Sequence, residues 1–375
     1  MSVASHPRNL GQELAGGAPI ALRETMTAAV LYGPEDLRIE RVPVPTIGED
    51  EALIRVEAAL TCGTDLKVWR NGSHARMIQP PEVFGHEMAG VVVATGSRVR
   101  KDIRVGMRVV PANSAPCGSC FYCLRHQETL CEDLVFNNGA YAPFARIPGR
   151  IVEKNLLEIP EGVKFEDAAM IEPLACVLRG VGEMSIASGD TVVVLGCGPI
   201  GLKFVRVLAA HGVQVIAVAK RPAQMDAARR LGARDVLNAS EGNNDGDLVA
   251  RVRKLTDSQR GADAVIEAVG RPEAWQQAIQ MARRGGMVNF FGGCPRGSAV
   301  EFDPAAIHYA EITIKSTFHH TPHYIREALA AISSGDVKAS DFVSGEISLE
   351  ELPEWFQRMK DRQSQMKTVV RANDS

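Results

Sequence analysis

The stretch that decides the fold runs from residue 191 to residue 222, TVVVLGCGPIGLKFVRVLAAHGVQVIAVAKRP. Residues 191–195 form a short, unbroken apolar run, which is typical of a parallel strand buried on both faces. Apolar residues then recur with a helical period through residues 200–211, and residues 214–219 predict a second strand. The stretch therefore predicts a strand–turn–helix–strand unit of a parallel α/β sheet.

The turn inside this unit has the spacing G-x-G-x-x-G, with glycines at Gly196, Gly198 and Gly201. Glycines at this spacing let backbone N–H groups approach a pyrophosphate, whose charge lies at the positive end of the following helix. A tight turn that binds nothing is the alternative. Because two strands flank the motif, we predict that a dinucleotide binds to Gly196, Gly198, Pro199, Ile200 and Gly201.

The end of the second predicted strand indicates which dinucleotide is preferred. Units specific for NAD usually place Asp or Glu there, about 20 residues beyond the glycines, to bind the ribose hydroxyls. This chain has Ala219, followed by Lys220 and Arg221. An acid would repel a 2′-phosphate, whereas a small residue and two cations offer space and charge. The sequence predicts a preference for NADP(H), with NAD possible and a solvated basic turn as the alternative.

The pattern changes along the chain. The region before residue 166 shows short strands broken by turns, with period-two alternation at residues 37–42. Strands then alternate with helices to about residue 292, which predicts a doubly wound parallel sheet, and the tail ends in the strand KTVVR. We expect a flexible N-terminal extension over residues 1–25. A β-rich domain should follow over residues 26–173 and be completed by the tail, residues 315–375. A Rossmann domain should lie between these two segments, over residues 174–314.

The bulk composition excludes several classes of protein. The chain has 375 residues, 45% of them hydrophobic, so it can form two ordinary cores. A net charge of -3 with mixed signs predicts no nucleic-acid partner, and no apolar run approaches the ~20 residues of a membrane helix. The N-terminus lacks a basic region followed by an apolar one, so we expect no secretory signal and a cytoplasmic location.

Four of the eight cysteines lie close together in the sequence. Their spacing is C-x2-C-x2-C-x7-C, which is metal-ligand spacing rather than a disulfide framework in a chain of this size. Four thiolates fill a closed tetrahedral zinc shell and leave no position for substrate. The sequence therefore predicts a structural zinc site made by Cys117, Cys120, Cys123 and Cys131.

A second set of metal-ligand types is dispersed over the chain. Cys62 is followed by Gly-Thr-Asp, His86 and Glu87 follow a glycine, and Glu172 precedes a proline where the two domains should meet. One thiolate, one imidazole and a carboxylate form a reasonable zinc shell with room for water or substrate. Alone, each residue is more often plain core or surface than a ligand.

Together these motifs resemble those of the zinc-dependent medium-chain alcohol and polyol dehydrogenases, over residues 26–371. The marks are CGTD at 62–65, GHE at 85–87, the cysteine lobe, EP at 172–173 and GCGPIG at 196–201. They look closest to the sorbitol and threonine dehydrogenase subgroup. The resemblance implies a GroES-like catalytic domain beside the Rossmann domain, a homodimer or homotetramer, and two zinc ions per chain. It implies a catalytic zinc on Cys62 and His86, with Glu87 and Glu172 in the shell.

The implied reaction is hydride transfer between a secondary alcohol or polyol and NADP(H) or NAD(H). Zinc would act as a Lewis acid on the alcohol. Thr64, two residues after Cys62, is placed to relay the proton by its hydroxyl, unless it is a plain turn residue. Lys67 lies at the position where relatives often carry a histidine. Three roles stay open for it: contact with the cofactor, acceptance of a proton if its pKa is lowered, or a solvated side chain.

Several alternatives stay open. An L-threonine or amino-polyol dehydrogenase has the same fold, and a non-catalytic zinc-stabilised nucleotide-binding protein would keep the cysteine lobe. A zinc-free reductase of this fold would lack CGTD, GHE and the lobe, which this chain has. The run 318–323 contains His319, His320 and His323, a set that also suggests a metal site. Because the zinc ligands are already assigned, we expect these histidines to line the cleft or cap the following helix, with substrate binding as the alternative. The sequence does not choose the alcohol, the reaction direction, or between dimer and tetramer.

Overall fold

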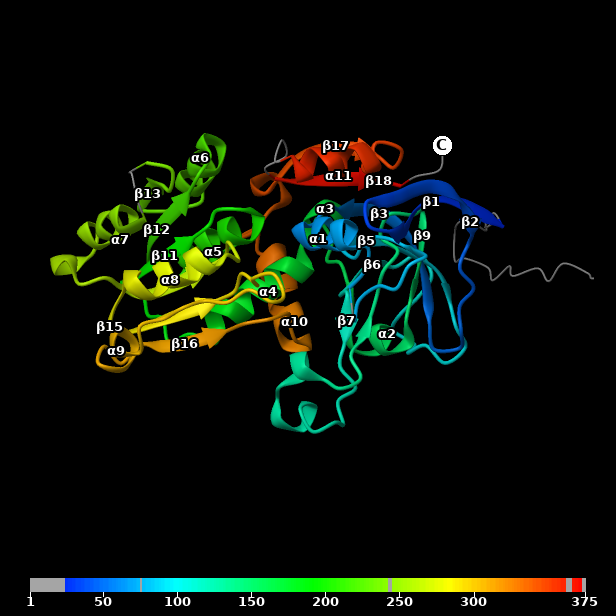
Figure 1. Ribbon diagram of the computed structural model, residues 1–375. Helices are drawn as coiled ribbons and strands as arrows, with labels where there is room; N and C mark the ends of the chain where they lie inside the picture. Colours follow the sequence, from blue (N-terminus) through cyan, green and yellow to red (C-terminus); the bar gives the residue numbers. More distant parts are fainter. Residues whose placement is uncertain (1–23, 75, 242–244, 362–365, 373–375) are drawn as a thin grey trace, which may run out of the picture.

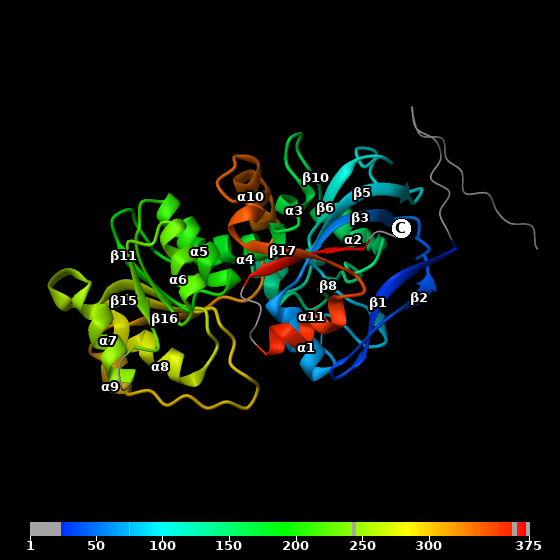
Figure 2. The same ribbon diagram turned by 90° about the horizontal axis from the view of Figure 1, so that it is seen from above.

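Two sheets lie toward opposite ends of the molecule, with the helices α4 (Ile171–Gly182) and α10 (Pro322–Ser333) between them (Figures 1 and 2). The computed structural model describes residues 24–74, 76–241, 245–361 and 366–372. The predicted extension at residues 1–25 therefore lies almost wholly outside the described residues. None of the described helices is both long enough and apolar enough to cross a membrane.

One sheet is parallel and carries the glycine motif. Within the described residues it has six strands in the order β13-β12-β11-β14-β15-β16, which is the predicted doubly wound arrangement. Its central strand β11 is buried on both faces, since Val192 and Val194 face one core cluster while Val193 and Leu195 face another. The strands are β11 (Thr191–Leu195), β12 (Gln214–Ala219), β13 (Asp235–Asn238), β14 (Ala262–Glu267), β15 (Ala282–Phe290) and β16 (Thr313–Ser316).

Helices cover both faces of this sheet. Residues of α4, α5, α6 and α10 belong to one core cluster, and residues of α7 and α8 belong to the other. The further elements here are α5 (Pro199–Ala210), α6 (Pro222–Arg230), α7 (Asp245–Lys254), η3 (Asp257–Gln259), α8 (Pro272–Met281) and α9 (Pro304–His308).

The predicted limits of the Rossmann domain fall inside regular elements. The limit after residue 314 cuts β16, which pairs with β15 as far as Ser316. The limit after residue 173 cuts α4, which continues without a break from Ile171 to Gly182. Both elements therefore continue across the predicted limits, and the domain division stays a prediction.

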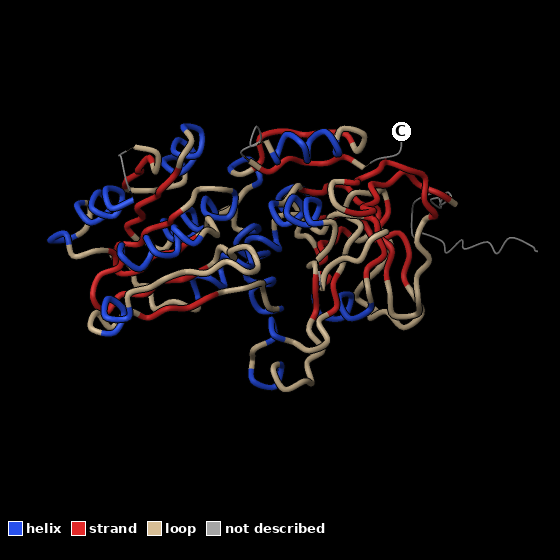
Figure 3. Tube along the Cα trace, viewed as in Figure 1, coloured by secondary structure: helices blue, strands red, loops and turns tan. Residues whose placement is uncertain are grey.

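The other sheet is mainly antiparallel, and Figure 3 shows that strands and loops predominate around it. Its order is β10-β6-β5-β3-β18-β17, with β9 also paired to β3, among the described residues. As predicted, the tail returns here, because β18 pairs with β3. The strands are β3 (Ala52–Leu60), β5 (Met88–Thr95), β6 (Arg108–Pro111), β9 (Phe144–Ile147), β10 (Leu156–Glu158), β17 (Val343–Ser348) and β18 (Lys367–Arg371).

Smaller elements complete this β-rich part. Helix α1 (Gly63–Asn71) packs on α11 (Leu352–Lys360), where the rings of Trp69 and Phe356 stack with centroids 5.8 Å apart. The cysteine lobe contains two short helices and projects beside α10 (Figure 1). The remaining elements are β1 (Thr25–Gly33), β2 (Asp36–Pro43), β4 (Glu82–Val83), β7 (Ser114–Ala115), η1 (Cys123–Arg125), η2 (Glu128–Leu130), β8 (Val135–Phe136), α2 (Gly149–Asn155), α3 (Phe165–Ala168) and η4 (Ala339–Asp341).

Candidate active site

Cys62 lies at the N-terminus of α1, where its side chain caps the helix. The backbone N–H of Thr64 donates to the Cys62 sulfur at 3.4 Å. A helix N-terminus stabilises negative charge, so this position favours the thiolate that a metal ion requires. The sulfur of Cys62, a ring nitrogen of His86 and a carboxylate oxygen of Glu87 lie within 4.8 Å of one another. The structure therefore brings together three of the four residues predicted for the catalytic zinc.

The ring of His86 is held by a buried chain of hydrogen bonds. Its Nδ1 lies 2.7 Å from Oδ1 of Asp65, and the hydroxyl of Tyr141 donates to Oδ2 of the same carboxylate at 2.7 Å. Burial alone would lower the pKa of His86, but Asp65 and Cys62 raise it well above its ordinary value. With Nδ1 taken by Asp65, Nε2 is the nitrogen left for a metal ion, an arrangement common around metal-bound histidines.

Glu87 has a partner that the sequence did not predict. The ammonium group of Lys367 on β18 lies 2.6 and 2.5 Å from the two carboxylate oxygens and also donates to the carbonyl of Thr61 at 3.0 Å. Burial opposes the charge of Lys367, whereas Glu87 and Cys62 raise its pKa above its usual value. Both side chains are buried, so this carboxylate has a fixed counter-ion.

Glu172 belongs to a different group of side chains. Its carboxylate, the sulfur of Cys176 and a ring nitrogen of His319 lie within 4.8 Å of one another, and all three residues are buried. Burial raises the pKa of Glu172, a shift that the charge of His86 opposes, so the two groups of ligand types are close enough to interact. The expected shell of four is thus divided into two clusters, and His319 and Cys176 were not predicted as members of either.

The other two histidines of the run have different surroundings. His320 is buried and its Nε2 lies 2.8 Å from Oδ1 of Asn113. His323 is exposed on α10, with Nε2 3.1 Å from a carboxylate oxygen of Glu327. Only His319 of the three joins a group that could hold a metal ion among the described residues.

The residues predicted to move a proton lie on α1. Thr64 is half-buried beside Cys62, and Lys67 is exposed one turn further along. The charge of Lys67 acts on Glu267 of β14, whose pKa burial raises to about 7 against the effect of Lys67. Lys67 therefore lies close enough to the parallel sheet for its charge to act on Glu267.

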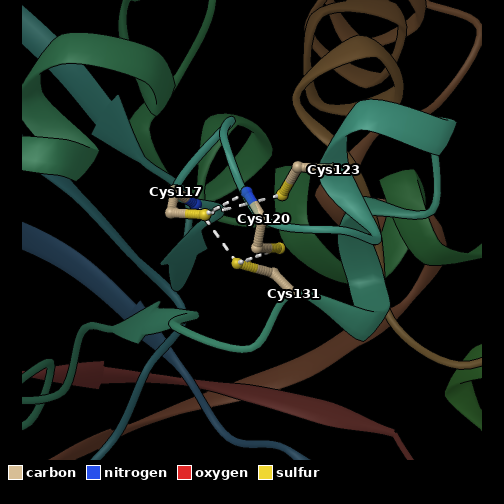
Figure 4. Close-up of side chains that lie close together, drawn as sticks. All are labelled: Cys117, Cys120, Cys123 and Cys131. Atoms are coloured by element: carbon tan, nitrogen blue, oxygen red, sulfur yellow. Dashed lines mark hydrogen bonds between the residues drawn. The ribbon is translucent and has the colours of Figure 1, made fainter.

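The four lobe cysteines converge as predicted (Figure 4). The sulfurs of Cys117 and Cys123 are 3.9 Å apart, and so are those of Cys120 and Cys131. Four sulfurs placed ~2.3 Å from a central zinc ion would be separated by about 3.8 Å. N–H groups of Ser119 and Cys120 lower the pKa of Cys117 to about 6, which favours the thiolate. The donor set and its size both fit zinc.

A cavity of about 480 Å³ lies at the carboxyl ends of β11 and β12. Predicted cofactor residues line it: Gly196, Gly198, Ala219, Lys220 and Arg221. The predicted residues Pro199, Ile200 and Gly201 begin α5 behind this wall. A Cβ on Gly201 would lie 1.8 Å from the Gly196 carbonyl oxygen, so only glycine permits this close turn.

Further residues that line this cavity were not predicted from the sequence. Gln224 of α6 and residues that follow β14, among them Arg271, complete the lining. Loop residues such as Arg271 have no periodic signal, and only the sheet order places them beside β11. Their position follows from the fold and not from the glycine motif.

Three features together define a zinc-binding, NAD(P)-dependent oxidoreductase: a cavity at a parallel sheet lined by the glycine motif, a cluster of Cys, His and Glu ligand types, and a four-cysteine lobe. The comparisons with known proteins agree. Residues 48–161 match the family model of the alcohol dehydrogenase GroES-like domain, and residues 199–334 match that of the zinc-binding dehydrogenase. The chain belongs to the zinc-dependent medium-chain polyol dehydrogenase family, and it is an NAD(P)-dependent alcohol dehydrogenase.

Similar proteins cover nearly the whole chain. Sorbitol dehydrogenase of Bacillus subtilis (strain 168) is 31% identical over 342 residues, which are 89% of this chain and 94% of that protein. L-threonine 3-dehydrogenase of Bacillus licheniformis is 30% identical over 339 residues, 88% and 94% of the two chains. A zinc-binding dehydrogenase from Sinorhizobium meliloti 1021, solved bound to NADP, has a TM-score of 0.83 at 30% identity and covers 93% of this chain and 99% of that one.

Proposed function

We propose that this protein interconverts a secondary alcohol or polyol and its carbonyl product, with NADP(H) as the preferred cofactor. The observation that supports the site is the convergence of the Cys62, His86 and Glu87 ligand atoms within 4.8 Å. These residues would hold the catalytic zinc, with Glu172 as the further carboxylate nearby, and the four lobe cysteines would hold a structural zinc. Each chain would then contain two zinc ions in these roles.

When bound, the catalytic zinc would supply Lewis-acid polarisation of the alcohol oxygen, and the nicotinamide would exchange hydride. The residues of the chain would orient the zinc ligands and take the proton from the alcohol. Asp65 fixes the ring of His86 through Nδ1, and Tyr141 fixes Asp65. The hydroxyl of Thr64, two residues after Cys62, would accept the alcohol proton while donating its own proton to water, and Lys67 would contact the bound cofactor.

The cofactor preference is supported by charge. Lys220 and Arg221 line the cavity next to buried Ala219, so a 2′-phosphate would meet two cations and no acid at the end of β12. The structure bound to NADP belongs to a relative with 30% identity. Steady-state assays with both cofactors test the proposal. A higher kcat/KM with NAD than with NADP would refute it.

Metal analysis combined with one substitution tests the catalytic site. Cys62→Ser should lose one zinc per chain and alcohol oxidation, while NADP still quenches protein fluorescence with an unchanged Kd. The retained binding shows that the variant is folded. Turnover by Cys62→Ser at the wild-type rate would exclude Cys62 as a ligand of the catalytic zinc.

The substrate class is proposed from relatives whose names include sorbitol and D-arabinitol dehydrogenases. An L-threonine or amino-polyol dehydrogenase is the second candidate, because a threonine dehydrogenase is nearly as similar. A panel of polyols, secondary alcohols and L-threonine separates the two. No turnover of any member, with NADP bound, would favour the non-catalytic nucleotide-binding protein. We also propose a homodimer or homotetramer in the cytoplasm, which light scattering and cell fractionation would test.

A further inference from the structure

Glu267 is the last residue of β14, and its side chain is completely buried. We propose that Glu267 positions the nicotinamide end of the cofactor site by holding together two turns at the edge of the parallel sheet. The proposal rests on the binding of a dinucleotide at this sheet, and it depends neither on the choice between NADP and NAD nor on the alcohol. Glu267 would act through these turns and not by contact with the substrate.

The side chain and the backbone of Glu267 bind different turns. One carboxylate oxygen, Oε1, accepts hydrogen bonds from the N–H groups of Val269 and Gly270 at 2.7 and 2.8 Å. The backbone carbonyl accepts hydrogen bonds from the N–H groups of Phe291 and Gly292 at 3.0 and 2.8 Å, in the turn that follows β15. Because β14 and β15 are paired, this single residue fixes the backbone at the carboxyl ends of two neighbouring strands.

The second carboxylate oxygen, Oε2, lies against the turn after β15. A Cβ on Gly292 would be 2.7 Å from this oxygen, so only glycine fits beside it. Oε2 has no hydrogen-bond partner among the described residues. Burial raises the pKa of Glu267 to about 7, so the charged carboxylate is disfavoured at this position. A buried carboxyl group with such a shift beside a cavity is typical of functional sites.

The turn that Glu267 holds forms part of the cofactor cavity. Ala268 and Val269 belong to the same lining as Gly196 and Ala219. The side chain of Val269 lies against Gly196, where a Cβ would be 2.6 Å from Cγ2 of Val269. Strands β11 and β14 are neighbours, and the helices that follow them, α5 and α8, cover opposite faces of the sheet. Dinucleotides bind across such a point, where the strand order reverses.

Charged residues distinguish the two ends of this cavity. Lys220 and Arg221 lie just beyond β12, where the 2′-phosphate of the adenosine half is proposed to bind. On the other side of β11, the charge of Lys67 on α1 acts on Glu267, and α1 begins next to the proposed metal ligand Cys62. The nicotinamide has to meet an alcohol held at that metal. It is therefore the nicotinamide half that we place at the Glu267 end.

The alternative is that Glu267 only stabilises the fold. Its loss would then weaken the binding of every ligand at the parallel sheet by a similar factor. A role in positioning the nicotinamide predicts instead that the loss is confined to the half of the dinucleotide that carries this ring. Probes that contain one half or both halves of the cofactor separate the two explanations.

The test is isothermal titration calorimetry on the zinc-loaded full chain, combined with initial rates. NADPH contains both halves of the cofactor, whereas adenosine 2′,5′-bisphosphate contains only the adenosine half. Glu267→Ala should bind the bisphosphate with the wild-type Kd but NADPH about tenfold more weakly. Its kcat should fall roughly hundredfold, because the ring is no longer held in place. Glu267→Gln, whose amide oxygen can accept the same two hydrogen bonds, should keep the NADPH Kd and kcat within about threefold of wild type.

The matched control is Asp263→Ala, which removes a carboxylate from the opposite end of the same strand. Asp263 accepts hydrogen bonds from the backbone N–H of Thr191 at 2.8 Å and from the guanidinium of Arg283 at 2.6 Å. Its loss should lower the unfolding temperature and leave both Kd values and kcat unchanged.

Wild-type NADPH affinity and kcat in Glu267→Ala would overturn the proposal. So would an equal loss of affinity for NADPH and the bisphosphate, or a loss in Glu267→Gln as large as in Glu267→Ala. If the alanine variant bound neither probe, Glu267→Met would replace it, since methionine fills the space without accepting a hydrogen bond. The same failure in Glu267→Met would also overturn the proposal, because Glu267 would then support the whole fold. If wild type prefers NAD, the comparison is made with NADH and adenosine 5′-diphosphate, so the NADP preference can fail while the role of Glu267 stands.

Discussion

Replacing Lys203 by methionine should stabilise the protein at and below neutral pH. Lys203 lies on α5 and is fully buried, and its Nζ has no hydrogen-bond partner in the described part of the chain. The amine lies 4.3 Å from the centroid of the Phe342 ring. Burial lowers the pKa of Lys203 from 10.5 to about 7. An ammonium group is therefore disfavoured in the folded protein.

The lowered pKa of Lys203 sets the size and the pH dependence of its cost to the free energy of unfolding. The folded protein releases the proton near pH 7, whereas the unfolded chain keeps it to about pH 10.5, so stability should rise with pH between these values. Below pH 7 the folded protein carries the full cost of burying the Lys203 ammonium. The pKa differs by 3.5 units between the unfolded and folded states, and at ~1.36 kcal/mol per unit this cost is at most about 5 kcal/mol. Methionine keeps the volume without the charge.

The assay is urea unfolding of the zinc-loaded protein at pH 6 and pH 9, with a matched variant. Lys203→Met should have the higher midpoint at pH 6, and its advantage should shrink at pH 9. Lys367→Met removes the counter-ion of buried Glu87 and should lose about 3–5 kcal/mol. If Lys203→Met lost as much free energy of unfolding at pH 6 as Lys367→Met, or more, the reasoning would be refuted. Lys203 would then have to be a charge that a counter-ion compensates.

Three further outcomes are expected. Ala219→Asp should lower the ratio of kcat/KM for NADP over NAD roughly tenfold to hundredfold, or about 1.4–2.8 kcal/mol, measured by initial rates; an unchanged ratio would contradict recognition at the end of β12. Cys123→Ser should lose one zinc per chain and unfold at lower temperature in calorimetry; full zinc content would exclude the lobe site. Gly201→Ala should abolish NADP binding, because its Cβ would lie 1.8 Å from a carbonyl oxygen. A Cβ on Gly198 meets nothing within 4 Å, so the control Gly198→Ala should fold normally by circular dichroism.

The parallel sheet could be predicted because its evidence is local. Apolar runs, glycines and helical periods lie within short windows, and β12 was predicted with the bounds it has in the structure. Strand β16, Thr313–Ser316, was missed because its four residues are not buried and show no apolar pattern. Lys203 was missed for the opposite reason. A lysine in a helix normally indicates the solvent face, and only the packing of α5 encloses this one.

The ligand types of the site could be predicted, but their partners could not. The motifs at Cys62 and His86 are short and recognisable, whereas Lys367 reaches Glu87 across 280 residues of sequence. His319 was identified only as part of a histidine run. Its neighbours Glu172 and Ser114 come from distant segments, so no spacing in the sequence could show them together.

Glu87 and Glu172 are both predicted to lie in the shell of the catalytic zinc, but the structure gives their carboxylates different surroundings. The effect of substituting each residue therefore has a different interpretation. Glu87 is bound through both oxygens by Lys367, so removing its charge leaves a buried ammonium without compensation. Glu172 lies beside a thiol and an imidazole, and burial raises its pKa. Neutralising Glu172 removes a charge that the fold disfavours. A lost activity at Glu172 would therefore report on metal binding or chemistry, whereas a lost activity at Glu87 would first report on stability.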